Sequence, residues 1–371
     1  MKQSKHNIYY SPKEVRTILE RSIDTALDGL KCYCNDPVSD FTRCRKLPAR
    51  SLIECIMSFS NYSSIGELSH FFVGQGEMPS ASALSQRRQL LDPDIFKRIN
   101  NLFVSAFDDH TTINGYHILA QDGSDVNIPF MDDKTKTEKH DAKSFCQYHV
   151  NALYDCLNKV FYDWSIDAAS KKREVNALIS ILKDRNYPQN SIFTADRGYE
   201  SYNLMAHFIE NDIKFVIRVK DIHTKSGLMT NIKTEEGAFD IRVTRTLTSL
   251  QTKEIKADKE KYIFVPSTSN FDFLDETRDL YDLSFRAVRF KISEDTYETV
   301  VTNLSEEEFK TEDFKELYHY RWNEETAFNK LKYTIGLVYF HARKRKLIQQ
   351  EINAAFLMYN VSEVIIRNIY L

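Results

Sequence analysis

Apolar residues recur at helical spacing through most of the first 105 residues of the chain. A period of 3.6 residues is typical of helices that bury one face. Three segments show this period and predict a helical N-terminal region: 49–63, 65–72 and 82–91. Ser80 or Ser82 is placed to cap the third helix, and Asp-Pro-Asp at 92–94 ends it.

The second and third of these helices are joined by a short linker, VGQGEMPS, at 73–80. Two short helices with such a connection are typical of a helix-turn-helix-like unit, which binds DNA with its second helix. In that interpretation Arg87 and Arg88 point outward. A small structural helix bundle fits the same pattern equally well.

From about residue 115 the pattern changes to short apolar runs that alternate with amphipathic segments. The runs predict strands at 116–123, 191–199 and 214–220, and a meander of two strands within 147–167. The amphipathic segments predict helices at 173–186 and 201–211. The first strand is expected to end at Asp122, and the strand before the second helix at Asp196. This order of elements predicts a mixed α/β core.

A different pattern interrupts this core. Residues at 239–248, 261–266 and 282–293 alternate apolar and polar at period two, which predicts an antiparallel β insertion. A further strand at 297–304 and a helix at 312–320 follow. We therefore divide the chain into a helical N-terminal region (1–110), a first part of the core (111–220), the β insertion (221–296), a second part of the core (297–345) and a C-terminal helical segment (346–371).

Composition describes a globular protein with a sizeable core, since 42% of the 371 residues are hydrophobic and 12% are aromatic. The formal net charge of −3 indicates no polyanion partner by itself. A nucleic-acid surface would need local basic patches, and two are present, at 85–89 and 341–346. Arg343 and Lys344 of the second patch are candidate phosphate contacts, although a solvated helix face fits as well.

Six cysteines show no spacing typical of zinc or of a disulfide framework. Cys32 and Cys34 lack a matching second pair, so reduced thiols and a cytoplasmic location are expected. The sequence contains no run of 18 apolar residues, so no membrane span is predicted. Polar residues interrupt the stretch 352–366, which predicts a packed amphipathic helix.

Three carboxylates are candidates for chemistry: Asp122, Asp196 and Glu325. Two follow apolar strands, and strand ends are where an α/β sheet presents its functional groups. Carboxylate oxygens are the ligands that Mg²⁺ prefers, so the three predict a magnesium site for phosphoryl transfer. Each Asp taken alone could equally cap a turn.

Neighbouring acids fit this set less well. Asp125 lies three residues after Asp122 and would face the opposite side of a strand. Glu324 lies 100° around a helix from Glu325. Glu200 is expected to open the helix that follows it as an N-terminal acid.

Residues 318–332 read YHYRWNEETAFNKLK, with no glycine or proline, and predict one continuous helix. Tyr318, Arg321, Glu325 and Lys332 then fall on one stripe, within roughly 60° of each other. An acid would be surrounded by hydrogen-bond donors. A solvated face with ion pairs four residues apart is the plainer alternative.

The four residues of this stripe make the pattern Y-x2-R-x3-E-x6-K without a gap. In this pattern the chain resembles the DDE transposases of the bacterial insertion-sequence 4 group. The segment QDGSDVNIP around Asp122 resembles the first acidic motif of that family, and TADRGYES around Asp196 resembles its second. The resemblance covers nearly the full length and implies an RNase H-like, or retroviral-integrase-like, core.

The resemblance also implies roles for individual residues. Asp122, Asp196 and Glu325 are expected to bind two Mg²⁺ ions, for which Mn²⁺ can substitute, and to nick double-stranded DNA at the transposon ends. A hairpin intermediate and strand transfer into target DNA are expected to follow. Phosphates near the cut are expected to contact the remaining residues of the motifs, which are Tyr318, Arg321, Lys332 and Arg197.

Some members of that family stabilise a flipped base with a tryptophan in the β insertion. The two tryptophans here, Trp164 and Trp322, lie outside that insertion. Phe271 or Phe273 is a candidate replacement.

The sequence thus predicts a metal-dependent cut-and-paste transposase. We expect it to bind terminal inverted repeats and target DNA as a homodimer in a synaptic complex, with the segment from 346 contributing to the dimer contact. The resemblance also implies a bacterial protein associated with the nucleoid, and no membrane partner is expected. A catalytically inactive DNA-binding relic and a structure-specific nuclease are the alternatives, whereas a glycosidase would leave the Tyr-Arg-Lys pattern unexplained.

Overall fold

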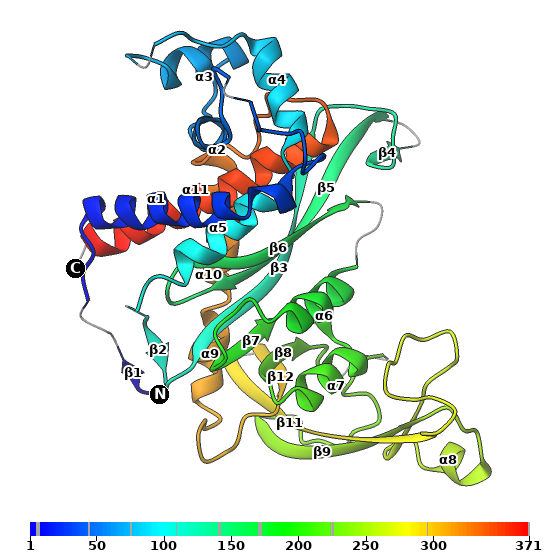
Figure 1. Cartoon of the computed structure of the whole chain (residues 1–371). Coiled ribbons are helices and arrows are strands. Elements are labelled where there is room, and N and C mark those ends of the chain that lie inside the picture. The colour runs from blue at the N-terminus through cyan, green and yellow to red at the C-terminus, as the bar shows by residue number, and fades with distance from the viewer. Residues whose placement is uncertain are drawn as a thin grey trace. The chain divides into compact units, whose positions relative to one another are not determined.

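The chain folds into two compact units, each assembled from separate parts of the sequence (Figure 1). The computed structural model describes residues 1–4, 8–43, 45–74, 76–108, 110–139, 142–169, 173–222, 224, 226–294 and 296–369. Unit 1 comprises Met1–Ser4, Thr111–Asp122 and Arg173–Trp322. Unit 2 comprises Lys5–His110, Gly123–Lys172 and Asn323–Leu371.

Unit 1 is built on a mixed sheet. Its strands are the first half of β3 (His117–Ile128), β7 (Ser191–Ala195), β8 (Lys214–Val219), β9 (Phe239–Thr248), β10 (Tyr262–Phe264), β11 (Leu280–Ser293) and β12 (Thr296–Thr302). They follow the order β10-β9-β11-β12-β8-β7-β3. Strands β3, β7 and β8 are parallel, whereas β12, β11 and β9 continue the sheet in antiparallel pairs.

The helices of unit 1 are α6 (Glu174–Asp184), α7 (Tyr202–Glu210), the short α8 (Lys253–Ala257) and α9 (Asp313–His319), with a 3₁₀ turn, η3 (Arg197–Tyr199). Helices α6 and α7 pack together over β7 and β8 (Figure 1). Helix α9 packs on β11. The small strands β1 (Gln3–Ser4) and β2 (Thr112–Ile113) pair with each other.

Unit 2 surrounds one long helix. Its strands are the second half of β3, β4 (Lys136–Lys139), β5 (Ala142–Asp155) and β6 (Val160–Ala168). Its helices are α1 (Pro12–Asp28), the 3₁₀ turn η1 (Leu30–Tyr33), α2 (Ala49–Met57), α3 (Ser64–Phe71), α4 (Ala81–Leu90), α5 (Asp94–Val104), α10 (Trp322–Tyr333, whose first residue belongs to unit 1) and α11 (Arg345–Ile369). Helix α11 packs against β6 and against helices α1, α2, α4 and α5.

These elements confirm the predicted fold class, an α/β core with a β insertion and helical regions toward both ends of the chain. In unit 1 the strands β3, β7 and β8 are parallel neighbours, and in unit 2 β5 and β6 form an antiparallel pair. The insertion supplies β9, β10 and β11, at the positions where the period-two pattern predicts strands. Strand β10 departs from the prediction, because it pairs with β9 in parallel. Among the described helices, none has the length and apolar character that a membrane span requires.

Two predicted boundaries next to the candidate site residues are wrong. Strand β3 does not end at Asp122 but continues to Ile128, because Val126 and Ile128 still bury their side chains. The helix predicted over 318–332 is broken, because α9 ends at His319 and α10 begins at Trp322. At the break the N–H of Arg321 donates to the carbonyl of Tyr318, three residues back, at 3.1 Å.

Candidate active site

Asp122 and Asp196 lie on neighbouring parallel strands of unit 1. The residues before them, Gln121 and Ala195, are buried and face each other in the register of β3 and β7. Adjacent strands are about 4.8 Å apart, and paired positions of parallel strands present their side chains on the same face. Both carboxylates become partly exposed just where the apolar pairing ends. The fold therefore brings these two predicted acids together.

The position of Asp196 is fixed by the turn that follows it. Its Oδ1 accepts the N–H of Gly198 at 2.8 Å and so caps η3. A Cβ atom at position 198 would lie 3.0 Å from that oxygen and 3.4 Å from Oε2 of Glu174. Glycine at this position leaves room for both carboxylates.

Glu174 is therefore a third acid near Asp196, and the sequence interpretation overlooked it. It lies in the first turn of α6, where the helix N-terminus stabilises a negative charge. The signal available in the sequence was its place at the start of the predicted helix 173–186.

Arg321 supplies a positive charge to this part of unit 1. Its Nη1 lies 3.5 Å from Oδ2 of Asp122, and the guanidinium side chain is 5% exposed. The guanidinium carbon lies 5.7 Å from the ring centroid of Tyr318 and 5.2 Å from that of Trp322. Arg321 is thus held inside unit 1 beside a candidate catalytic acid.

Tyr318 is also buried, with 1% of the residue exposed. Burial raises the pKa of its phenol, and the opposing effects of Arg321 and Arg218 are smaller. With Glu298, Trp322 and Phe290, it lines a cavity of 470 Å³ within unit 1. In this structure Tyr318 does not present its hydroxyl on the surface, contrary to what the predicted phosphate contact requires.

Glu325 and Lys332 belong to unit 2, so the predicted stripe is shared between the units. Because α10 begins at Trp322, Glu325 lies in its first turn, where the helix dipole favours an anion. Glu325 is partly exposed, whereas its neighbour Glu324 is fully buried. The two acids therefore have different environments, as the preference for Glu325 requires.

Lys332 lies near another acid of unit 2. Burial lowers the pKa of its ammonium, and Asp125 acts in the opposite direction. Oδ1 of Asp125 is also 2.7 Å from Nδ1 of the buried His149. Asp125, His149 and Lys332 thus form a polar cluster that the sequence did not reveal.

Glu200 does not open α7 as predicted, because Ser201 caps that helix. Instead its carboxylate accepts the backbone N–H groups of Lys220, at 3.0 Å, and Leu228. Gly227 has φ +134°, and a Cβ atom there would collide with Oε1 of Glu200. Glu200 therefore stabilises the loop after β8.

The basic candidates have contrasting environments. Arg88, predicted to point outward, is 3% exposed, and its guanidinium donates to Glu351 and to the carbonyl of Leu347. That expectation is wrong, because Arg88 is part of the core around α11. Arg87 is partly exposed, whereas the other candidates are fully exposed: Arg197, Arg343 and Lys344.

The aromatic candidates are engaged in packing. Phe271 and Phe273 contact each other and Tyr281, with centroid distances of 5.3–5.8 Å. Trp164 is buried and stacks on a phenylalanine of α11. Trp322 is the more exposed of the two tryptophans, at 47%.

The carboxylates of Asp122 and Asp196 fit a hard divalent cation, since both are oxygen donors on adjacent strands and remain partly exposed. Across the described residues, no group of three or more His, Cys, Asp or Glu side chains is arranged to hold a metal ion. The donor chemistry thus fits Mg²⁺ at the two aspartates.

Unit 1 thus combines a mixed sheet with two partly exposed carboxylates, Asp122 on β3 and Asp196 directly after the neighbouring strand β7. The family model for the transposase DDE domain matches residues 113–361, which include Asp122, Asp196 and Glu325. The chain belongs to this family. Membership confirms the predicted resemblance to DDE transposases.

No curated protein matches the sequence. One of the solved structures similar to the chain is the cryo-electron microscopy structure of a piggyBac transposase synaptic complex with hairpin DNA. It is 10% identical, with a TM-score of 0.46, and the match covers 100% of this chain and 78% of that one. A likeness of this size says nothing about function.

Proposed function

We propose that the protein is a metal-dependent DNA transposase with Asp122, Asp196 and Glu325 as its catalytic carboxylates. The observation that supports this proposal most is the register of β3 and β7, which pairs Gln121 with Ala195, the residues directly before Asp122 and Asp196. Family membership supports transposition as the process. The match to Y-x2-R-x3-E-x6-K favours the insertion-sequence 4 group.

The three carboxylates would hold two Mg²⁺ ions, or Mn²⁺ in their place. When bound, these ions would activate the attacking hydroxyl and stabilise the leaving oxygen of a phosphodiester. Gly198 holds the Asp196 carboxylate through its N–H, and Arg321 lies beside Asp122. Arg321 therefore acts as a positioning residue that balances the charge of Asp122 before DNA binds.

The remaining basic residues would contact DNA phosphates. Arg197 directly follows Asp196 and is exposed, and so are Arg343 and Lys344. Lys332 would approach a phosphate from α10. Tyr318 would do so only after its surroundings open, since it is buried.

The reaction we propose is cleavage at the inverted repeats of the transposon ends, a hairpin intermediate on each end, and strand transfer into target DNA. A homodimer would hold the two ends together, because both must be cut in a coordinated way.

The test is cleavage of a labelled duplex that carries the inverted repeats flanking the gene, with Mg²⁺ or Mn²⁺. We expect nicking at the repeat boundary by the parent protein and loss of nicking in Asp122→Asn, Asp196→Asn and Glu325→Gln. Asp132→Asn is the matched control, since that side chain is 81% exposed. Titration of Mn²⁺ by calorimetry would report weaker binding in the three variants independently of activity.

The outcomes separate the alternatives. Binding of the repeats without cutting in either metal would indicate a DNA-binding relic. Cleavage without any joining to target DNA would indicate a structure-specific nuclease. Equal nicking by the parent and Glu325→Gln would remove Glu325 from the catalytic set.

A further inference from the structure

A cleft rich in arginine lies in the helical part of unit 2. Its residues belong to other segments of the chain than Asp122, Asp196 and Glu325. It has a volume of 410 Å³. Its walls come from the loop before α2 and from α4: Ser39, Asp40, Phe41, Thr42, Arg43, Arg45, Gln86, Arg87 and Leu90. Three guanidinium groups and one carboxylate give the cleft a net positive charge.

Arg87 forms the fixed wall of this cleft. Its Nε donates to the carbonyl of Leu47 at 3.1 Å, and its guanidinium carbon lies 4.1 Å from the centroid of the Phe41 ring. Its Nη2 is shielded from water and has no hydrogen-bond partner in the part of the chain that the structure describes. A buried donor without an acceptor is costly, so an oxygen ligand that reached this nitrogen would be stabilised.

Phe41 keeps its position at a conformational cost. Its φ is +57°, in the left-handed region that a bulky side chain rarely adopts. The conformation places the aromatic ring against the guanidinium of Arg87, which restricts the rotamers of that arginine. The donor is therefore held in place before any ligand arrives.

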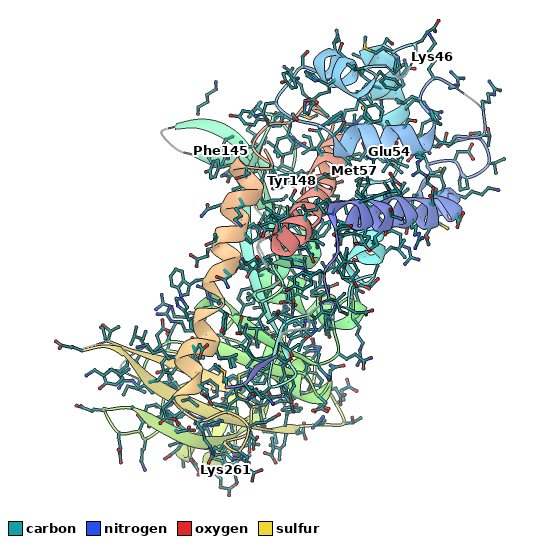
Figure 2. All side chains as sticks on the ribbon, turned by 90° about the vertical axis from the view of Figure 1, so that its left-hand side faces the viewer. Lys46, Glu54, Met57, Phe145, Tyr148 and Lys261 are labelled. Atoms are coloured by element: carbon teal, nitrogen blue, oxygen red, sulfur yellow. The ribbon has the colours of Figure 1, made fainter. Side chains whose placement is uncertain are left out.

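The two other arginines are exposed donors beside this partly buried one. Arg43 and Arg45 are exposed, and the positive charge of Arg45 lies close enough to lower the pKa of Arg87, as burial does more strongly. Figure 2 shows Lys46, which follows Arg45, at the outer edge of the helical region. Like charges gathered in this way are stabilised by an anion.

The single acid of the cleft is already engaged. Oδ2 of Asp40 accepts the backbone N–H of Asp36 at 2.9 Å. Beyond the cleft the positive charge continues at the end of α4, where Nζ of Lys346 donates to the carbonyl of Gln89 at 3.1 Å and Lys344 donates to the Gln89 side chain. The basic surface is therefore longer than one small anion.

We propose that this arginine cleft binds a backbone phosphate of duplex DNA through Arg43, Arg45 and Arg87. The proposal rests on the function proposed above, because it takes DNA as the partner. An extended row of charge beside the cleft fits a polyanion better than free phosphate. Since the fixed arginine is held against protein groups, the cleft positions the duplex and does not read its bases. Arg88 has no part in this contact.

The test is fluorescence anisotropy with two labelled duplexes, one carrying the inverted repeat and one a scrambled sequence, over a range of salt concentrations. The variant is Arg43→Ala/Arg45→Ala in the full chain, which spares the hydrogen bond of Arg87. We expect affinity for both duplexes to fall about 10-fold or more. The slope of log K against log salt should decrease by about one for each lost phosphate contact.

The matched control is Arg16→Ala, which removes one positive charge from a side chain of α1 that is 79% exposed and pairs with Glu20. It should change affinity by less than about twofold. Unchanged affinity and slope in the double variant would overturn the cleft proposal, while cleavage by the parent protein would still uphold the proposed function. A loss confined to the inverted-repeat duplex would overturn phosphate contact in favour of base recognition.

A further arm distinguishes free phosphate from DNA. Inorganic phosphate at matched ionic strength should raise the melting temperature of the parent protein little. A large rise that the double variant loses, together with unchanged DNA affinity, would assign the cleft to a small anion and overturn DNA as its occupant. No binding of either duplex by the parent protein would overturn the proposed function and the cleft proposal together.

Discussion

Arg88 holds together the contacts between α4 and α11 in unit 2. Its Nη2 donates to Oε1 of Glu351 at 2.6 Å and to the carbonyl of Leu347 at 2.7 Å, and its Nε donates to Gln350 at 3.1 Å. Both charged partners are nearly fully buried. Arg88→Ala would therefore remove the permanently charged partner of the buried Glu351, leaving it only His341, and lower the free energy of unfolding by about 3–5 kcal/mol.

Chemical denaturation of the full chain measures this change in the free energy of unfolding. Arg16→Ala, on the exposed face of α1, should change the free energy of unfolding by about 0.5 kcal/mol or less. A similarly small change for Arg88→Ala would show that the buried pair adds nothing to stability.

His341 makes the stability of unit 2 depend on pH. Its Nε2 lies 3.0 Å from Oε1 of Glu67, and its Nδ1 lies 3.4 Å from Oε2 of Glu351. Burial by itself lowers the pKa of His341, but the two carboxylates outweigh burial and raise the pKa above its ordinary value of 6.5. Because the pKa of His341 is higher in the folded state, protonated His341 stabilises the fold. This stabilisation is complete below the pKa of the unfolded state and is lost as the pH rises through the pKa of the folded state.

We therefore expect the free energy of unfolding to fall as the pH rises above 6.5 and through the raised pKa of His341. His341→Gln should flatten this dependence, and urea denaturation at each pH measures it. His70→Gln is the control, because His70 lies outside this pair of carboxylates. An equal slope in the parent protein and in His341→Gln would assign the pH dependence to other groups.

Two neighbouring arginines of α4 show how far the sequence alone can predict the environment of a charged side chain. Arg87 and Arg88 are identical in type and adjacent in sequence, yet one lines an open cleft and the other is buried. The distinction depends on Glu351, 263 positions away. Local pattern identifies a basic helix, whereas its long-range partners decide which charge is available.

At the scale of elements, the apolar periodicity located the strands of the core and the helices α2, α3, α4, α6 and α7, but it gave no bounds for α1 and α5. Asp196 could be placed because the five residues of β7 are all buried and end abruptly. Asp122 was placed on the correct strand, but the strand continues through Gly123. No glycine or proline marks the helix break at 320–321 in the sequence. The break could not be predicted from local pattern, because the ion pair of Arg321 with Asp122 beside it is a tertiary contact.

Arg289 of β11 joins this strand to two other parts of the β insertion, its first residue and the loop before β9. Nε and Nη2 of Arg289 each donate to Asp221 at 2.9 Å, and Nη1 donates to the carbonyl of Gly237 at 2.8 Å. Burial by itself raises the pKa of Asp221, but Arg289, the N–H of Ile222 and Thr299 hold it at about 2. Asp221 therefore stays ionised and paired at neutral pH.

Arg289→Ala should lower stability by about 1–3 kcal/mol, because it leaves hydrogen-bond acceptors of Asp221 and Gly237 unsatisfied. Hydrogen–deuterium exchange should become faster in β9, β11 and β12, and remain unchanged in α5 and α11. Arg242→Ala, an exposed arginine of β9, is the matched control. Faster exchange throughout both units would show that the insertion unfolds together with the whole chain.

At the scale of the whole molecule, α11 limits where a second chain can bind. The segment from 346 was predicted to contribute to a dimer contact, but most of its apolar residues pack inside unit 2. Ile366 and Ile369, at 42% and 60% exposed, lie near its end and offer little area for a stable interface. Pairing of two chains through α11 alone is therefore not expected.

If the protein is a cut-and-paste transposase, both transposon ends must be held before cleavage. DNA can then supply the contact area that the exposed end of α11 does not. We expect two chains to assemble on two inverted-repeat duplexes. Analytical ultracentrifugation of Glu325→Gln with the repeat, which prevents cleavage, measures the stoichiometry. The scrambled duplex is the control. A complex of one chain with one duplex, in place of two chains with two duplexes, at concentrations well above the dissociation constant would argue against coordinated cutting and in favour of a nuclease that acts on single sites.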